Sequence, residues 1–140
     1  MKKLIITLLA LLLSVNAFAQ EDDELLEPEK AFALTVTELD ANTIEARWDI
    51  AAGYYLYRGK LGFNSDTPGI TLGEPRYPKG KIKNDEFFGD VEIYRGTVTI
   101  TIPVERATGA PDTLSLTANS QGCADIGVCY PPLRQSREIT

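Results

Sequence analysis

The sequence of 140 residues contains no histidine, only two cysteines and a single tryptophan. Without histidine, Ser–His or Cys–His nucleophilic catalysis and His-ligated metal sites are excluded. Two cysteines alone cannot complete the usual tetrahedral zinc site. The formal net charge is −6, and an acidic domain repels phosphate backbones, so no nucleic-acid partner is expected. The two cysteines are therefore the remaining residues whose chemistry must be considered.

Long apolar runs are also scarce, and the one present opens the chain. Lys2 and Lys3 precede an apolar stretch over residues 4–15, and residues 17–19 read Ala-Phe-Ala. This pattern predicts a signal peptide over residues 1–19 and export to the periplasm. The alternative, a membrane anchor, would need ~20 apolar residues. Gln20 would then be the first mature residue, so no lipid-anchored cysteine is expected. Removal of the two lysines lowers the formal net charge to −8.

The mature part divides into an acidic segment and one domain. Residues 20–30 are acidic and poorly patterned, and we interpret them as a flexible lead-in. From residue 31 to residue 140 the apolar period is two, which predicts half-buried strands. Trp48 lies in the clearest apolar row and is assigned to the core. The expected strands span residues 32–37, 44–50, 54–61, 70–72, 91–94, 98–104, 114–118 and 134–140. Seven or so short strands without helical periodicity predict an all-β antiparallel sandwich.

The two cysteines, Cys123 and Cys129, are separated by five residues. An even number of cysteines in an exported protein predicts a disulfide. A turn through Gly127 would bring their Cα atoms to the usual separation of about 5.5–6 Å. Such a bridge is either a structural staple or a redox-active pair, and the spacing alone leaves both open. No cation is adjacent in sequence, and Asp125 would raise a nearby thiol pKa, so the pair should be a poor spontaneous nucleophile.

Four sequence blocks resemble the N-terminal periplasmic domain of the bacterial thiol:disulfide interchange protein DsbD family. They are Gly-Tyr-Tyr-Leu-Tyr-Arg at 53–58, Asp-Glu-Phe-Phe-Gly at 85–89, Glu-Ile-Tyr-Arg at 92–95, and the cysteine block with Tyr-Pro-Pro at 121–132. The resemblance covers residues 31–132 and implies an immunoglobulin-like sandwich with the cysteine pair at one end. The alternative is a non-catalytic immunoglobulin-like binding module with a structural disulfide.

The resemblance also implies a function, a direction of electron flow and a set of partners. The domain would act as a protein-disulfide reductase that takes electrons from a thioredoxin-like domain. It would pass them to the periplasmic disulfide isomerase and to the cytochrome c maturation thioredoxin. Cys129 would form the mixed disulfide with partners, Cys123 would be the resolving thiol, and no other cofactor is expected. The family's membrane segment is missing here, so the chain is either a fragment of a membrane-embedded protein or a stand-alone relative.

Further residues acquire roles through the same resemblance. They are the cap-loop residues Asp85, Glu86, Phe87, Phe88 and Gly89, and the aromatic residues Tyr55 and Tyr57 beside the site. Phe87 would shield the pair, and Phe88 stands where some relatives have tyrosine. The ordinary alternatives are strand packing for the tyrosines, anchoring in the core for the phenylalanines and a solvated loop for the two acids. Alternation places Tyr55 and Tyr57 on one face and Tyr54 on the other.

Overall fold

The computed structural model describes residues 24–140, so the predicted signal peptide over 1–19 lies outside the described residues. The regular secondary structure of the described residues consists of strands, with one helical turn and one 3-10 turn. In chain order these elements are α1 (Pro28–Ala31), β1 (Phe32–Asp40), β2 (Thr43–Ile50), β3 (Tyr54–Tyr57), the 3-10 turn (Arg58–Lys60), β4 (Gly62–Ser65), β5 (Ile70–Leu72), β6 (Lys81–Asp85), β7 (Gly89–Tyr94), β8 (Thr97–Arg106), β9 (Leu114–Ser120), β10 (Gly122–Ala124), β11 (Val128–Cys129) and β12 (Leu133–Ile139).

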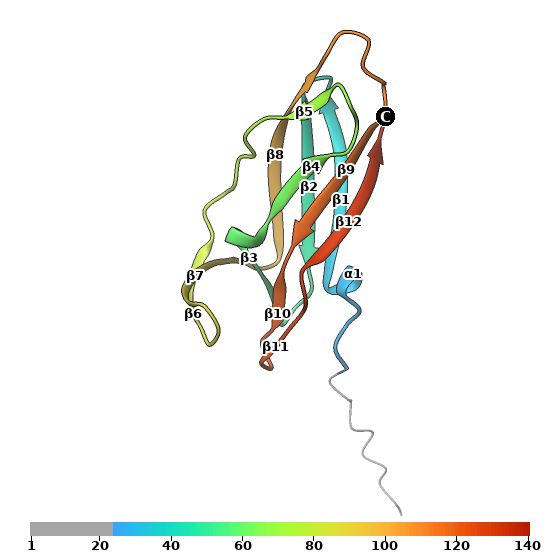
Figure 1. The fold of residues 1–140 in the computed structure, drawn as a ribbon. Coiled ribbons are helices and arrows are strands. Elements are labelled where there is room, and N and C mark those ends of the chain that lie inside the picture. The colour runs from blue at the N-terminus through green and yellow to red at the C-terminus, as the bar shows by residue number, and fades with distance from the viewer. Residues whose placement is uncertain (1–23) are drawn as a thin grey trace, which may run out of the picture.

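The strands form two facing layers (Figure 1). One layer is the sheet β1-β2-β8-β5. The other is divided between the sheet β12-β9-β4 and the five-stranded sheet β11-β10-β3-β7-β6. Only Gln121 separates β9 from β10, so one chain segment passes from the first of these sheets into the second. All strand pairs are antiparallel, which confirms the predicted all-β sandwich.

The core forms where the apolar rows of the two layers meet. Trp48 of β2 lies opposite Val98 of β8, and both side chains are buried. The Trp48 ring packs against Phe63 of β4, with 5.7 Å between the ring centroids. Its indole N–H donates to Oε1 of Gln135 on β12 at 3.4 Å, which satisfies a buried polar group. The assignment of Trp48 to the core is therefore confirmed.

Several predicted strand boundaries were wrong. The expected strand over 54–61 ends at Tyr57, because Arg58–Lys60 forms a 3-10 turn. β4 (Gly62–Ser65) and β6 (Lys81–Asp85) were missed: both lie among turn residues, and the β6 side chains are mostly exposed. Within the predicted lead-in, α1 begins at Pro28. The backbone N–H of Leu26 also donates to the Tyr54 hydroxyl at 2.9 Å.

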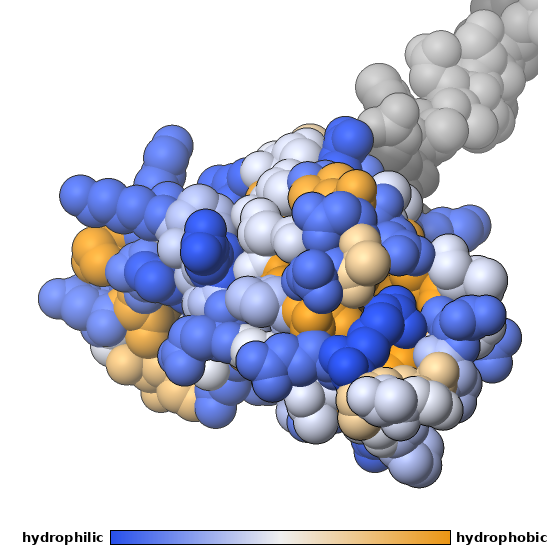
Figure 2. Space-filling model, turned by 90° about the horizontal axis from the view of Figure 1, so that it is seen from above, coloured by the Kyte–Doolittle hydropathy of each residue, from blue (hydrophilic) through white to orange (hydrophobic). Residues whose placement is uncertain are grey.

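The five-stranded sheet carries the cysteines at the lower end of the molecule in Figure 1. The opposite end, seen from above in Figure 2, is covered mainly by hydrophilic residues with small apolar patches between them. No helix among residues 24–140 is long and apolar enough to cross a membrane. The fold thus presents the cysteine pair on a short hairpin at one tip of the sandwich.

Candidate functional site

The disulfide joins the two strands of the terminal hairpin. Cys123 of β10 and Cys129 of β11 lie directly opposite each other and are bonded. Their Cα atoms are 3.9 Å apart, which is closer than the separation we expected. The two cysteines form a non-hydrogen-bonded pair of the antiparallel ladder, in which opposite Cα atoms lie closest together. Gly127 closes the turn with φ 97°, as its position in the sequence predicted.

The two sulfurs differ in accessibility. Cys123 is 1% exposed and packs with Tyr55, Tyr57 and Ile93 in a small cluster of its own. Cys129 is only partly buried, because β11 is the edge strand of its sheet. An incoming sulfur therefore has an approach to Cys129 that it lacks to Cys123.

Strand β3 places two tyrosines beside the buried sulfur. Tyr55 lies opposite Cys123 in the β3–β10 ladder, and Tyr57 follows two residues later on the same face. The Tyr57 hydroxyl oxygen is 3.0 Å from Cys123 Sγ and 3.8 Å from Cys129 Sγ. Tyr54 points to the other face, where it packs against Phe32 and Tyr130. The predicted division of the three tyrosines between the faces is confirmed.

Asp85, at the end of β6, connects the tyrosines to the cap loop. Its Oδ2 accepts hydrogen bonds from the Tyr55 and Tyr57 hydroxyls, both at 2.8 Å. Its Oδ1 accepts from the backbone N–H groups of Phe87 at 2.8 Å and Phe88 at 3.0 Å. Asp85 is 4% exposed, so it is a buried carboxyl with every lone-pair direction used.

This hydrogen-bonding pattern sets the charge state of the network. Burial by itself raises the pKa of the Asp85 carboxyl, but the hydrogen bonds outweigh burial and hold that pKa below its ordinary value of 3.8. Burial and the bond to Asp85 raise the pKa of the Tyr57 phenol well above its ordinary value of 10.0. At neutral pH the site therefore holds a carboxylate and two neutral phenols.

The cap loop between β6 and β7 packs beside the cysteine pair. Phe88 packs edge-on against Tyr57, with 5.2 Å between ring centroids, and Lys60 Nζ lies 5.2 Å from the Phe88 ring centroid. Phe87 is 59% exposed, yet it lines a cavity of about 50 Å³ together with Glu86 and Cys129. This space is large enough to hold water. Gly89 adopts φ 73° and allows the sharp return of the chain into β7.

Charged side chains surround Tyr55 and the hairpin turn. Lys83 Nζ and the Arg95 guanidinium lie 5.3 Å and 5.2 Å from the Tyr55 ring centroid. Arg95 also forms a two-pronged ion pair with Asp125, at 2.8 and 3.0 Å. Sequence reasoning assigned no role to Lys83 or Arg95, because both lie far from the cysteines in sequence. The only available signal was Asp125, a hairpin acid without a cation among its sequence neighbours.

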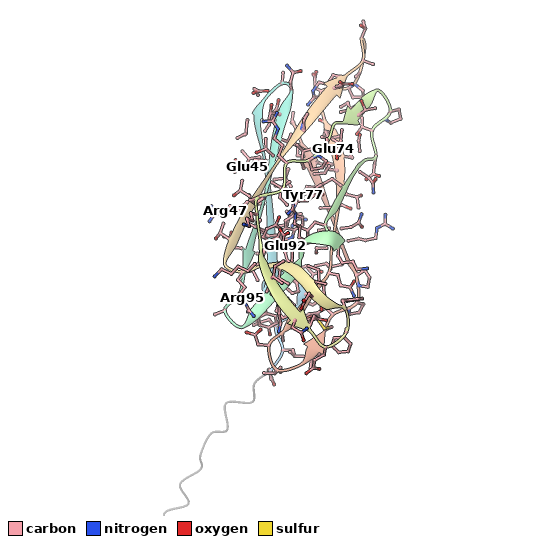
Figure 3. All side chains as sticks on the ribbon, turned by 90° about the vertical axis from the view of Figure 1, so that its left-hand side faces the viewer. Glu45, Arg47, Glu74, Tyr77, Glu92 and Arg95 are labelled. Atoms are coloured by element: carbon pink, nitrogen blue, oxygen red, sulfur yellow. A yellow bond between two sulfur atoms is a disulfide. The ribbon has the colours of Figure 1, made fainter. Side chains whose placement is uncertain are left out.

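A wider groove of about 580 Å³ borders the site on the other side of Phe88. Tyr57, Tyr77 and Phe88 form part of its wall, and Glu92 on its rim binds Arg58 at 2.5 Å. Tyr77 and Glu92, both labelled in Figure 3, line this groove. The groove leaves open space directly beside the Phe88 ring.

The described residues contain no group of three or more histidine, cysteine or acidic side chains arranged to hold a metal ion. The arrangement of Cys123, Cys129, Tyr55, Tyr57 and Asp85 instead surrounds a single disulfide with hydroxyl groups and a carboxylate. Its available chemistry is thiol–disulfide exchange at one partly exposed sulfur.

Solved structures of Neisseria meningitidis domains share this fold. The reduced DsbD N-terminal domain superposes with a TM-score of 0.73 at 38% identity, covering 83% of this chain and 90% of that one. The DsbD N-terminal domain in its complex with the PilB N-terminal domain gives a TM-score of 0.68 at 35% identity, covering 82% and 87% of the two chains. Both solved structures are thus similar to most of this chain.

Full-length sequences agree with the structural similarity. The thiol:disulfide interchange protein DsbD of N. meningitidis serogroup A is 41% identical over 100% of this chain, which corresponds to 23% of the relative. DsbD 2 of Pseudomonas aeruginosa is 37% identical over 98% of this chain and 24% of the relative. The chain thus spans about a quarter of the length of these curated relatives. A family model described as "Thiol:disulfide interchange protein DsbD, N-terminal" matches residues 22–140, and the chain belongs to this family.

Proposed function

We propose that this domain is a protein-disulfide reductase that carries electron pairs through the Cys123–Cys129 disulfide. It would take them from a thioredoxin-like domain and deliver them to periplasmic thioredoxin-fold acceptors, such as a disulfide isomerase and the cytochrome c maturation thioredoxin. The observation that carries the proposal is the unequal burial of the two sulfurs. Cys129 is partly exposed on an edge strand, whereas Cys123 is buried 3.0 Å from the Tyr57 hydroxyl.

Electron delivery would proceed in two exchange steps. In the reduced domain, the Cys129 thiolate attacks one sulfur of the acceptor disulfide, and a bond between domain and acceptor forms as the acceptor disulfide breaks. Cys123 then loses its proton and attacks Cys129 Sγ, which restores the intramolecular disulfide and releases the second acceptor sulfur. Both acceptor thiolates are protonated, so two electrons and two protons reach the acceptor. A dithiol donor reverses the same steps.

The tyrosine–aspartate network would keep the resolving thiol protonated between encounters. The Tyr57 phenol has one proton, which it donates to Asp85. Toward Cys123 its oxygen is therefore an acceptor, and it suits a neutral S–H. The nearby Asp85 carboxylate also disfavours a thiolate by like-charge repulsion. Such a pair reacts slowly with random oxidants, which is useful to a reductant in an oxidising compartment.

The cap loop would limit access to the reactive sulfur. The cavity beside Cys129 holds about 50 Å³, which is too small for a partner's sulfur and its flanking backbone. Phe87 and Glu86 are exposed residues of its lining, and a partner that reaches Cys129 through this cavity would displace them. The open groove beside Phe88 leaves room for the loop to shift while β6 and β7 remain paired.

A partner would find an apolar rim around the cysteine pair. Four exposed apolar side chains lie at this tip. Phe87 and Phe88 belong to the cap loop, Ile126 to the hairpin turn and Val128 to β11. Exposed aromatic and aliphatic groups of this kind are typical anchors of a protein interface. The complex of the Neisseria DsbD N-terminal domain with the PilB N-terminal domain supports partner docking in this family.

Periplasmic location and a membrane-embedded parent protein belong to the same proposal. They rest on the signal-peptide pattern over residues 1–19 and on the family, whose curated relatives are about four times as long as this chain. The same proposal divides the chain into a signal peptide over residues 1–19, a lead-in over 20–30 and an exchange domain over 31–140.

The alternative remains a binding module with a structural disulfide. Equilibration of the purified domain with a reduced thioredoxin-type protein separates the two functions. A carrier reaches a redox equilibrium within minutes and keeps its fold in both states, as monitored by near-UV circular dichroism. A bridge that is reduced only together with unfolding would contradict the carrier function.

A further inference from the structure

Arg95 contacts both the β10–β11 hairpin, through Asp125, and Tyr55 of β3, although it contacts neither sulfur. It follows β7 and lies in the turn that leads to β8. Its guanidinium donates two hydrogen bonds to the Asp125 carboxylate, at 2.8 and 3.0 Å. Asp125 lies in the hairpin turn between Cys123 and Cys129. Arg95 therefore holds the redox hairpin from a neighbouring part of the sheet.

The same guanidinium has two further contacts. One Nη donates to the backbone carbonyl of Tyr54 at 3.3 Å, and the guanidinium carbon lies 5.2 Å from the Tyr55 ring centroid. The bidentate bond to the carboxylate is a geometry that arginine provides and lysine does not. In Figure 3 Arg95 lies nearer than Arg47 to the lower end of the molecule. The residue is thus fixed on three sides beside the hairpin.

We propose that Arg95 is a positioning residue of the redox site, which fixes the β10–β11 hairpin through Asp125 and neutralises that carboxylate beside Cys129. Asp125 and Cys129 line the same small cavity, so the charge of Asp125 acts across a short gap on the partly exposed sulfur. The inference rests on the proposed role of Cys129 as the sulfur that meets partners.

Arg95 offsets part of the negative charge that surrounds the Cys129 thiol. The groups that face this region from the surrounding elements are Tyr55 and Tyr57 of β3, Lys83 and Asp85 of β6, Glu86 of the cap loop, Asp125 of the hairpin and Arg95. Three carboxylates stand against two cations. The hydrogen bond and charge of Arg95, with help from Lys83, also lower the pKa of the Asp125 carboxyl, so Asp125 stays ionised at neutral pH. Removal of Arg95 leaves an excess of two negative charges, which destabilises a Cys129 thiolate.

The test measures the Cys129 thiol directly and needs no partner protein. In a Cys123→Ser background, the rate of alkylation by iodoacetamide is recorded from pH 6 to pH 11. Arg95→Gln is expected to raise the Cys129 thiol pKa and to slow alkylation at pH 7 by about threefold, as expected for a half-unit shift. Arg95→Lys keeps the charge but not the two-pronged bond to Asp125, so its Cys129 thiol pKa is expected to lie between those of Arg95→Gln and the parent protein.

A second substitution separates charge compensation from structural damage. Asp125→Asn added to Arg95→Gln removes the uncompensated carboxylate, and it is expected to return the Cys129 thiol pKa to the parent value. Arg47→Gln breaks the similarly exposed Arg47–Asp49 pair on β2 and is the matched control, for which no shift is expected. An unchanged pKa in Arg95→Gln, or a double variant as shifted as the single one, would overturn the proposal. If the domain proves not to carry electrons between proteins, the effects of these substitutions on the Cys129 thiol pKa are still measurable. The two proposals can therefore fail separately.

Discussion

The phenolic oxygen of Tyr57 lies 3.0 Å from Sγ of Cys123, the buried member of the disulfide. This contact brings a hydroxyl, rather than a cation, to the sulfur. Because Tyr57 also donates to the buried Asp85 carboxylate, the surroundings favour a neutral thiol over a thiolate. That the pair reacts poorly without a partner stays a prediction, and this contact adds a reason for it.

Removal of the buried cysteine should trap a partner. In Cys123→Ala the mixed disulfide at Cys129 has no resolving thiol, so a covalent complex with a thioredoxin-fold protein should accumulate. Non-reducing gel electrophoresis measures it, and a variant with both cysteines replaced by alanine is the control. If Cys129→Ala traps the partner instead, the roles of the two cysteines are reversed.

Removal of the outer cap side chain should expose the reduced pair to small oxidants. Phe87→Ala opens the cavity beside Cys129, so oxidation by a small disulfide should be severalfold faster in stopped-flow measurements. Ile82→Ala is a matched control, because Ile82 is an exposed apolar residue of the neighbouring strand β6. Equal oxidation rates for Phe87→Ala and the parent protein would rule out shielding by Phe87.

The Asp85 network should contribute to stability in a pH-dependent way. Asp85→Asn removes the charge and leaves one acceptor oxygen for four donors, so the free energy of unfolding should fall by about 1–3 kcal/mol at pH 7. The folded pKa of Asp85 lies below its ordinary value of 3.8, so this stability is present above that value. It is lost as the pH falls through the lower, folded pKa.

Chemical denaturation at pH 7 and at successively lower pH values measures this dependence. The difference between parent and Asp85→Asn should shrink below pH 3.8. Asp90→Asn is the control: Asp90 is an exposed aspartate on the same sheet that accepts from Asn84, and its substitution should change stability little. A difference that stays constant down to the acid transition would contradict the assignment of the ionised form to Asp85.

The backbone of the redox hairpin should tolerate no side chain at position 122. A Cβ on Gly122 would lie 2.3 Å from the Tyr55 carbonyl oxygen and 2.6 Å from the Phe32 ring. Gly122→Ala should therefore lower the unfolding free energy by about 1–3 kcal/mol or more. Gly59→Ala is the matched control, because its added Cβ would meet no atom within 4 Å. Equal melting temperatures for Gly122→Ala and the parent protein would show that β10 and β3 can move apart.

Sequence reasoning succeeded where local patterns carry the information. Alternation predicted the buried rows around Trp48, and cysteine count predicted the bridge that the structure contains. It failed at β6, whose side chains are mostly exposed and whose row of lysines has no apolar period. It also extended β3 beyond Tyr57, although the aromatic run ends there and Arg58–Lys60 forms a 3-10 turn.

The sequence by itself determined the fold class, the disulfide and the faces of Tyr54, Tyr55 and Tyr57, because periodicity and cysteine spacing are properties of neighbouring residues. Only the tertiary structure decided which sulfur is buried, that Asp85 receives both tyrosine hydroxyls, and that Arg95 binds Asp125. These contacts join residues about 30 positions apart in the chain or more. Their partners are selected by strand order and register, and a single sequence does not record which strands become neighbours.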